Sequence, residues 1–367
     1  MRQHTFSPVD YGGITLKNRI VFAPTSFGLP EEAYVGKIRE IASGGCAMVV
    51  IGDVPVSRHA PGSLFSKKGF ERYRTLVEAI HEGGAVACAQ LHQSDSDILG
   101  MIRYIPGVLL GRTSPDDLRK ILNDRVGDYV TNMPASKVEG IIESFGMAAR
   151  RAVEAGFDVV QVHGDRMCGS FSSALFNKRT DRFGDDAEGR MRFAVEAVER
   201  VRDAVPDVPV DYKLAVRQES PHYGNAGVLE EELPAFVPAL VKAGVTSFHV
   251  TLANHGDLGD TIPSRSHPDF SEEGCFLKFC DEVRALTDVP ITGVGGLVHP
   301  DFVEEQIASG RIDCAAMSRQ LIADPAWPRK VESGHEDDVR FCIRCNKDCL
   351  GGIQRHEGVH CVFDGRD

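Results

Sequence analysis

Hydrophobic and polar positions along the chain follow two alternating periods. Short runs rich in Val, Ile and Ala are apolar at almost every position, which is typical of parallel strands that helices cover on both faces. Longer stretches between them carry apolar residues near i, i+3, i+4 and i+7, as in residues 136–156, and predict amphipathic helices. Gly156 and Gly244 each stand just before a strand, where the C-terminal cap of a helix is expected. The predicted strands cover residues 19–24, 47–53, 85–91, 157–163, 208–216, 246–252, 289–294 and 312–318.

This alternation predicts the fold. Eight βα units, in which each helix returns the chain to the start of a parallel strand, are expected to form an α/β fold, a (β/α)8 TIM barrel. The barrel is expected to span residues 1–335, followed by a C-terminal segment of residues 336–367. Residues 91–135 form a long polar connection, and a structureless loop of that size usually serves as a lid or binding element.

Composition narrows the class of protein. Hydrophobic residues make up 42% and charged residues 26% of the chain, as in soluble globular proteins. The N-terminus lacks the apolar core of a signal peptide, and no run approaches the roughly 20 apolar residues of a membrane span. A formal charge of −12 argues against a nucleic-acid partner. We therefore expect a cytoplasmic protein that acts on a small molecule.

In a TIM barrel the catalytic residues lie at the carboxyl ends of the strands. In this sequence most of the residues at those ends are polar or glycine. Strand ends of this composition predict a binding or catalytic site on one face of the barrel. The residues at these ends are Pro24, Thr25, Gly52, Asp53, Gln90, His92, His163, Asp165, Arg166, Lys213, Arg217, Asn254, His255, Gly295, Gly296, Ser318 and Arg319.

The last two strand ends predict a phosphate site. Gly295 and Gly296 follow one strand, and a helix is expected to begin near Pro300. Backbone N–H groups that glycine exposes near a helix N-terminus form an anion nest. A tight turn is the alternative, but Arg319 at the last strand favours phosphate, which barrels commonly bind at these two loops.

Four cysteines near the C-terminus predict a metal site. Their spacing is C-x2-C-x3-C-x11-C, and without a secretion signal such a group favours metal over disulfides. Four thiolates hold either zinc or an iron–sulfur cluster, and the residues alone leave both open. The four are Cys342, Cys345, Cys349 and Cys361.

Six motifs in the same order along nearly the whole chain carry a family resemblance: LKNRIVFAPTSFG, AQLHQ, AGFDVVQVH, NKRTDRFG, VGG and MSRQLIADP. Together they resemble the Old Yellow Enzyme family of FMN-dependent reductases, in a subgroup similar to the N-terminal part of 2,4-dienoyl-CoA reductase. The resemblance implies FMN on the C-terminal face, with the pyrimidine edge at Gln90, a cation near N1 at Lys213, and the phosphate at the last two strands. The FMN-binding residues implied are Pro24, Thr25, Gly52, Gln90, Lys213, Gly295, Gly296, Ser318 and Arg319.

The same resemblance implies that the cysteines hold a [4Fe–4S] cluster, so that residues 336–367 form an iron–sulfur segment. Long relatives continue into FAD and NAD(P) domains, whereas this chain ends six residues after Cys361. Electrons are therefore expected from NAD(P)H, from a reduced partner protein such as an electron-donor flavoprotein, or from a further domain outside this sequence.

The segment HGDRMCGSF, residues 163–171, departs from the family pattern of two clamp residues and a tyrosine acid. His163 is kept, Arg166 replaces the second clamp residue, and Cys168 stands at the tyrosine position. A guanidinium is a poor acid, but its paired N–H groups form a fork that donates well to a carboxylate or a polarised carbonyl oxygen. Asp165 is expected to orient that fork or to relay a proton through water. His163, Asp165 and Arg166 are thus the predicted catalytic residues, with a structural Asp–Arg pair at the barrel rim as the alternative.

The HGDR motif followed by Gly–Ser also indicates a substrate class. It resembles the signature of subgroup members that reduce bilirubin, a linear tetrapyrrole, to urobilinogen, although a related motif occurs in reductases of unsaturated bile-acid or steroid ketones. We expect hydride transfer from reduced FMN to conjugated C=C bonds of such a tetrapyrrole. The alternatives are an enoate, dienoyl-CoA or 3-oxo-Δ4-steroid reductase, and a non-catalytic flavin and iron–sulfur electron carrier. Arg103, Tyr129, Asn254 and His255 are weaker substrate-side candidates.

Overall fold

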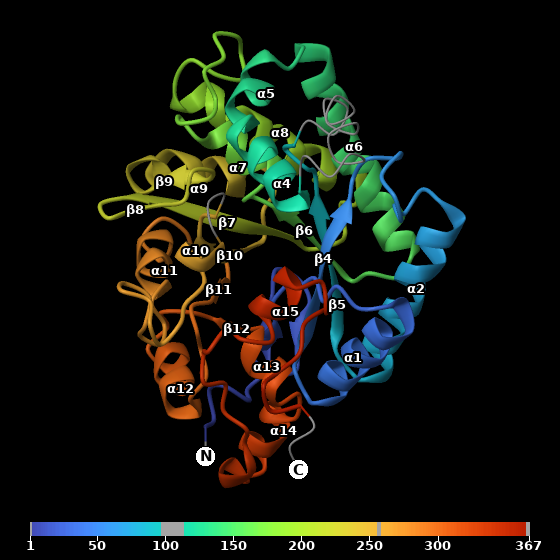
Figure 1. Ribbon diagram of the computed structural model, residues 1–367, viewed down its shortest axis with the longest axis vertical. Coiled ribbons are helices and arrows are strands. Elements are labelled where there is room, and N and C mark those ends of the chain that lie inside the picture. The colour runs from blue at the N-terminus through green and yellow to red at the C-terminus, as the bar shows by residue number, and fades with distance from the viewer. Residues whose placement is uncertain (1, 97–113, 255–257, 365–367) are drawn as a thin grey trace.

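The computed structural model describes residues 2–96, 114–254 and 258–364 and contains the predicted barrel (Figure 1). Each barrel strand pairs in parallel with the next one along the chain, and the last strand pairs with the first, so the sheet closes into a barrel. The TIM-barrel prediction is therefore confirmed. The barrel strands are β3 (Ile20–Phe22), β4 (Met48–Pro55), β5 (Val86–His92), β6 (Val159–His163), β7 (Val210–Glu219), β10 (Ser247–Leu252), β11 (Ile291–Gly293) and β12 (Cys314–Met317).

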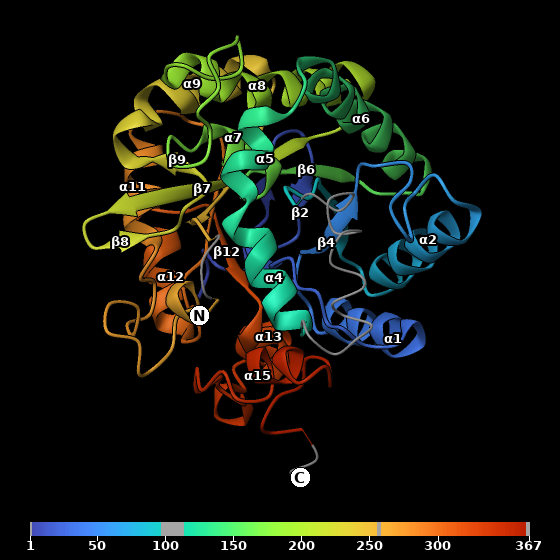
Figure 2. The ribbon, with the colours of Figure 1, turned by 45° about the horizontal axis from the view of Figure 1, so that its top comes forward.

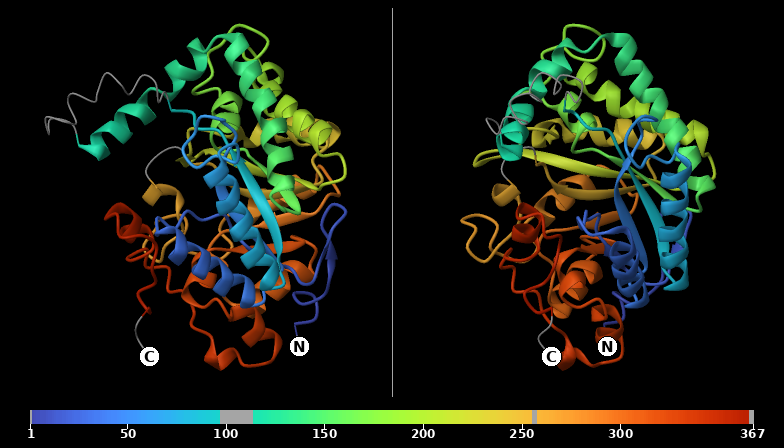
Figure 3. Two further views of the ribbon diagram at one scale, coloured as in Figure 1. Left: turned by 90° about the vertical axis from the view of Figure 1, so that its right-hand side faces the viewer. Right: turned by 45° about the vertical axis from the view of Figure 1, so that its right-hand side comes forward.

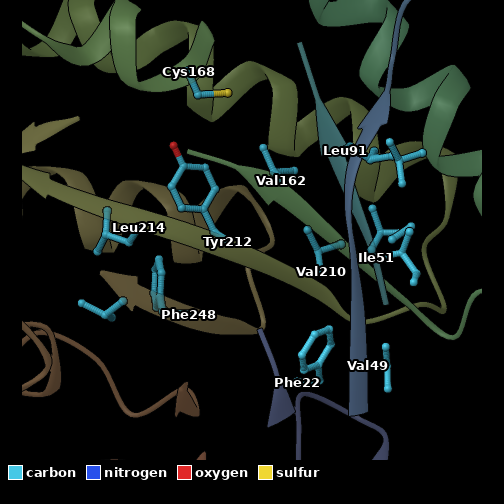
Figure 4. Close-up of a cluster of buried hydrophobic side chains, with 14 of the residues drawn as sticks. Phe22, Val49, Ile51, Leu91, Val162, Cys168, Val210, Tyr212, Leu214 and Phe248 are labelled. Atoms are coloured by element: carbon cyan, nitrogen blue, oxygen red, sulfur yellow. The ribbon is translucent and has the colours of Figure 1, made fainter. Parts of the chain in front are cut away.

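Helices form the outer layer and bury the apolar outer faces of the strands. Gly156, with φ +102°, and Gly244, with φ +117°, end two of these helices in the left-handed conformation that favours glycine, which confirms both predicted caps. Figure 4 shows the packed layer, with side chains such as Phe22, Tyr212 and Phe248 on the helix side of the strands. The helices are α1 (Glu31–Ser43), α2 (Lys67–Glu82), α6 (Ala135–Glu154), α8 (Ala187–Ala204), α9 (Leu233–Ala243), α11 (Leu277–Arg284), α12 (Pro300–Ala308) and α13 (Arg319–Ala323).

An N-terminal hairpin of β1 (Val9–Asp10) and β2 (Thr15–Leu16) contributes to the barrel interior. Tyr11, between these strands, is fully buried among the inward-facing small side chains of the barrel. Its hydroxyl lies 2.9 Å from Asp211 Oδ1 and 2.9 Å from Thr292 Oγ1. The hairpin therefore ties the start of the chain to the barrel core.

Residues 91–135 are not structureless, and that part of the prediction is wrong for the section from 115 to 132. This section folds into α4 (Pro115–Asp124) and α5 (Val126–Asn132), which cross in front of the barrel in Figure 2. The start of α4 is stabilised by a capping box, in which Ser114 and Asp117 satisfy one another's backbone N–H groups. Residues 97–113, which include Arg103, lie outside the described part of the chain.

The remaining elements lie in the connections between the barrel units and in the C-terminal segment. The C-terminal segment contacts the loop that follows β3, where the Val359 N–H donates to Phe27 O at 2.7 Å. Figure 3 (left) shows this segment and α4 on one side of the barrel, with the N-terminal hairpin on the other. No helix within the described ranges is long and apolar enough to cross a membrane. These elements are α7 (Met167–Ser172), β8 (His222–Tyr223), β9 (Val228–Leu229), η2 (Glu230–Glu232), α10 (Leu258–Thr261), α14 (Trp327–Glu332), η3 (Glu336–Asp338) and α15 (Leu350–Gln354).

Candidate active site

Four predicted cofactor residues from three strands meet at one end of the barrel. A Cβ atom added to Gly52 would lie 3.3 Å from Pro24 Cβ, 3.5 Å from Thr25 N and 3.7 Å from Gln90 Oε1. Thr25 Oγ1 in turn lies 2.7 Å from Ser318 Oγ, at the end of β12. A side chain at residue 52 would therefore press against Pro24, and glycine lets Pro24, Thr25 and Gln90 lie close together there. The assignment of these residues to the flavin ring stays a prediction.

The predicted phosphate residues line one cavity of about 90 Å³ at the ends of β11 and β12. Gly295 and Gly296 have φ +140° and +71°, and a Cβ on Gly295 would lie 2.9 Å from Phe276 N. Only glycine fits there, so the backbone lies open to the cavity. Ser318 and Arg319 complete the wall. The structure therefore brings together all four residues that the sequence assigned to phosphate.

Arg344 lines the same cavity and was not predicted. Its Nη1 atom is buried, has no hydrogen-bond partner within the described part of the chain, and lies 3.5 Å from the Cβ position of Gly296. The predicted cation Arg319 already donates from Nη1 to Pro263 O at 2.5 Å and to Asn346 Oδ1 at 2.6 Å. A buried unpaired N–H is costly, and an anion in this cavity would satisfy it. The donor set therefore fits the phosphate of FMN.

No sequence signal pointed to Arg344, because it stands between Cys342 and Cys345 in a motif that predicts metal binding. Only the path of the C-terminal segment brings it to Gly296.

Two histidines lie side by side at the mouth of the barrel. The rings of His163 and His92 have centroids 5.5 Å apart, and the Nδ1 atoms of both are buried without a hydrogen-bond partner among the described residues. Burial, together with the nearby cation of Lys213, holds the pKa of His163 well below its usual value. His163 is therefore neutral at physiological pH and offers one N–H donor and one acceptor.

Lys213 is the residue of β7 that is in register with His163. Burial lowers the pKa of its ammonium, while the carboxylates of Asp165 and Asp53 oppose that shift. The amine of Lys213 thus lies next to His163 at the mouth of the barrel, and its predicted role beside the flavin stays a prediction.

Asp53 and His92 form a second polar pair, which the sequence placed at strand ends without giving it a role. His92 Nδ1 lies 3.6 Å from Asp53 Oδ1, which is longer than a hydrogen bond, and Ser26 Oγ donates to Asp53 Oδ2 at 2.6 Å. Burial opposes ionisation of Asp53, but His92, Ser26 and Arg166 together hold its pKa below the usual value. Asp53 also has φ +54°, a conformation that few residues other than glycine adopt.

Asp165 and Arg166 do not form the ion pair that the sequence analysis considered. The buried carboxylate of Asp165 accepts a hydrogen bond from the backbone N–H of Asn254 at 2.9 Å. Arg166 precedes α7, is half-buried, and its guanidinium donates no hydrogen bond to a described residue. Its charge nevertheless acts on Asp53 and His92, so it lies over the same mouth. The guanidinium is therefore available to a ligand.

Cys168, at the position of the family's tyrosine acid, does not face the mouth. It is fully buried on α7 and lies near the hydroxyl end of Tyr212, on the helix side of the barrel (Figure 4). Burial raises the pKa of its thiol. A proton donor to the substrate must come from another residue or from water.

The four C-terminal cysteines line one cavity together with Arg319. Within the residues described, no three His, Cys, Asp or Glu side chains converge closely enough to hold a metal ion. Burial raises the pKa of Cys342, Cys349 and Cys361. The cluster predicted from the spacing stays a prediction.

The weaker substrate-side candidates have separate outcomes. Tyr129 lies on α5, where the ammonium of Lys137 stands 5.0 Å from its ring centroid. Asn254 contributes its backbone to Asp165, while His255 and Arg103 lie outside the described residues.

The barrel carries polar groups and a cavity of about 90 Å³ at the carboxyl ends of its strands, where enzymes of this fold have their active sites. The chain belongs to the NADH:flavin oxidoreductase / NADH oxidase family, whose model matches residues 4–338. It is a flavin-dependent oxidoreductase, and the resemblance found in the sequence is confirmed. The family supports FMN as the cofactor and NADH as an electron donor.

Individual relatives differ in length. The chain is 60% identical over 359 residues to a bilirubin reductase of Clostridium symbiosum, covering 97% of this chain and 96% of that protein. It is 32% identical to a bilirubin reductase of Mediterraneibacter gnavus and 30% identical to an NADH oxidase of Thermoanaerobacter brockii. These two alignments cover 98% and 95% of this chain, respectively, but only 56% and 53% of the relatives' own lengths.

Solved structures support the fold. A 2-naphthoyl-CoA reductase in complex with 2-naphthoyl-CoA superposes with a TM-score of 0.81 at 22% identity, over 100% of this chain and 57% of that one. Morphinone reductase superposes with a TM-score of 0.66 at 19% identity, over 91% of each chain. At these identities the likeness concerns the fold alone.

Proposed function

We propose that this protein reduces conjugated C=C bonds of bilirubin, a linear tetrapyrrole, towards urobilinogen. The observation that carries the proposal is the 60% identity to a bilirubin reductase over 97% of the chain. The mouth supports it, because Arg166 lies over the predicted flavin site with its guanidinium not bonded to any described residue.

The chain has residues to hold each part of FMN. Pro24, Thr25 and Gly52 would contact the ring, Gln90 its pyrimidine edge, and Lys213 the region where negative charge collects on reduction. The cavity lined by Gly295, Gly296, Ser318, Arg319 and Arg344 would bind the phosphate. When bound, FMN supplies the hydride for the substrate carbon.

Arg166 would bind an oxygen of the substrate. Its fork suits either a lactam carbonyl or a propionate carboxylate, and it keeps its proton at ordinary pH. As electrons enter the C=C bond, negative charge develops on the conjugated oxygen, and a fixed cation stabilises that charge. Neutral His163 would donate a second hydrogen bond there.

Proton delivery would fall to Asp165 through water, because Cys168 lies behind the barrel wall. Asp165 is held by the Asn254 N–H and lies close enough to Lys213 to influence its pKa. Asp165, once protonated from solvent, would pass that proton through an ordered water molecule to the substrate carbon and return to the carboxylate.

We also propose that Cys342, Cys345, Cys349 and Cys361 bind a [4Fe–4S] cluster, which makes residues 336–367 the iron–sulfur segment. The spacing of the four cysteines and the cavity that they share with Arg319 support this. NADH, NADPH or a reduced partner protein would supply the electrons. Location in the cytoplasm rests on composition alone.

The test uses anaerobically purified protein with FMN and iron restored. The flavin is reduced, and either bilirubin or a bile-acid 4-en-3-one is added in separate arms. We expect loss of the bilirubin absorption band together with reoxidation of the flavin. Consumption of the enone alone would replace the proposal with a steroid reductase, and reoxidation by neither would indicate an electron carrier.

A further inference from the structure

Three polar side chains form a hydrogen-bonded chain inside the barrel, below the mouth. Gln90 Nε2 donates to Gln161 Oε1 at 2.6 Å, and Gln161 Nε2 donates to Asp211 Oδ2 at 2.5 Å. The three residues come from the adjacent strands β5, β6 and β7 and are at most 2% exposed. The chain therefore runs through the low-dielectric interior, where hydrogen-bond direction matters most.

At Asp211, the end of this hydrogen-bonded series that lies farthest from the mouth, the direction of the hydrogen bonds is fixed. Ser247 Oγ donates to Asp211 Oδ1 at 2.6 Å, and Tyr11 OH donates to the same oxygen at 2.9 Å. Burial raises the pKa of Asp211 to about 6, against the effect of these donors and of Gln161. At neutral pH Asp211 is thus a carboxylate, which accepts hydrogen bonds and donates none.

This polarity passes from one amide to the next. Since Asp211 accepts only, the NH2 group of Gln161 must face it, and the carbonyl of Gln161 must then face Gln90. The NH2 group of Gln90 donates its hydrogen bond to the carbonyl oxygen of Gln161. Gln90 Oε1 is left towards Gly52 and accepts no hydrogen bond among the residues that the structure describes.

We propose that Asp211 is a positioning residue that acts through Gln161 to make Gln90 a hydrogen-bond acceptor at the flavin site. The matching donor on FMN is the N3–H group of the pyrimidine ring. The inference rests on the proposed binding of FMN, and it adds the reason why Gln90 presents its oxygen rather than its NH2 group.

An Asp211→Asn variant keeps the shape of the chain and removes its direction. The hydroxyls of Ser247 and Tyr11 can accept as well as donate, so either end of the new amide can face Gln161. Both amides then lose their fixed orientation. Ser247→Ala, measured at about pH 8, is the matched control. It removes one donor at the same carboxylate, and the higher pH keeps Asp211 ionised and therefore an obligate acceptor although the loss of that donor raises its pKa further.

The experiment measures FMN binding to the apoprotein by fluorescence quenching, and the N3–H resonance of bound 15N-labelled FMN. We expect a protected N3–H signal in the wild-type protein and in Ser247→Ala. In Asp211→Asn the signal should shift upfield and exchange faster with solvent, and the Kd for FMN should rise by about threefold to tenfold, the equivalent of one hydrogen bond.

Gln161→Met serves as a second variant if Asp211→Asn does not fold, since it cuts the chain with a neutral side chain of similar length, and the same loss is expected. An unchanged N3–H signal and Kd in the folded variants would overturn the inference while leaving FMN binding intact. Failure of the wild-type apoprotein to bind FMN would overturn the proposed function and this inference with it.

Discussion

The carboxylate of Asp165 accepts a hydrogen bond from the backbone N–H of Asn254 at 2.9 Å, and so joins the end of β6 to the end of β10. Asp165 is thereby held in place without Arg166, and the two adjacent charged residues of the HGDR motif are separated in role. Asp165 is positioned by Asn254, whereas the guanidinium of Arg166 donates no hydrogen bond to a described residue.

Replacing Asp165 by Asn should separate its charge from its structural role. An amide oxygen can still accept from the Asn254 N–H, so thermal stability and FMN affinity should stay at the wild-type level. Turnover should fall by about 10²-fold, which is typical for loss of a group that handles a proton. Asp165→Ala should also lower the free energy of unfolding by about 1–3 kcal/mol, because a backbone N–H loses its acceptor. Wild-type turnover in Asp165→Asn would remove Asp165 from the reaction.

Arg166→Ala should keep FMN and lose turnover. Removing a donor that stabilises developing negative charge commonly costs about 10²–10³-fold in kcat. Arg166→Lys should recover only part of the activity, because an ammonium cannot form the two parallel bonds of a guanidinium. Single-turnover reoxidation of the reduced flavin by bilirubin measures this step, and full activity in Arg166→Ala would exclude the role proposed for it.

Arg344→Ala should weaken FMN binding. One hydrogen bond from a charged donor is worth about 1.5–3 kcal/mol, which corresponds to a rise in Kd of about 10- to 100-fold. Arg355→Ala is the control, since Arg355 lies in the same segment but forms exposed pairs with Glu357 and Asp348. Titration of the apoprotein with FMN and with riboflavin, which has no phosphate, distinguishes the cause. Arg344→Ala should change the affinity for FMN only, and an equal loss for riboflavin would show a general structural effect.

Glu304 should give the fold a measurable pH dependence away from the active site. Partial burial opposes its ionisation, but hydrogen bonds from Thr5 and His4 outweigh that effect and hold its pKa at about 2. A depressed pKa means that the contribution of Glu304 is complete above its ordinary pKa of about 4.5 and is lost as the pH falls towards 2. Glu304→Gln should therefore cost about 1 kcal/mol of unfolding free energy at pH 7, a value in the range of half-exposed pairs.

Denaturant unfolding of wild type and Glu304→Gln at pH 7 and at pH 2.5 tests this difference. The gap between the two proteins should shrink at the lower pH. A gap that does not change with pH would mean that ionisation of Glu304 does not stabilise the N-terminus.

Much of the fold could be predicted because its signals are local. Eight apolar runs, separated by amphipathic helices with glycine caps, allow few arrangements other than a barrel. The place of Pro24, Gly52 and Gln90 at one face followed from the same reasoning, since the ends of parallel strands meet there. Their assignment to the flavin came from the family resemblance. The helices α4 and α5 were not predicted, because the length and polarity of residues 91–135 indicate a loop, whereas the capping box of Ser114 and Asp117 is a short local signal.

The sequence by itself determined the barrel, the face that carries the chemistry, and the residue types at each strand end. Only the tertiary structure decided which of these groups are paired. Arg344 reaches Gly296, Asp165 binds Asn254, and Asp211 sets the direction of Gln90 through contacts between segments that are distant along the chain. The physical reason is that strand and helix periods are read over neighbouring residues, whereas the direction and satisfaction of a buried hydrogen bond depend on every group that packs around it.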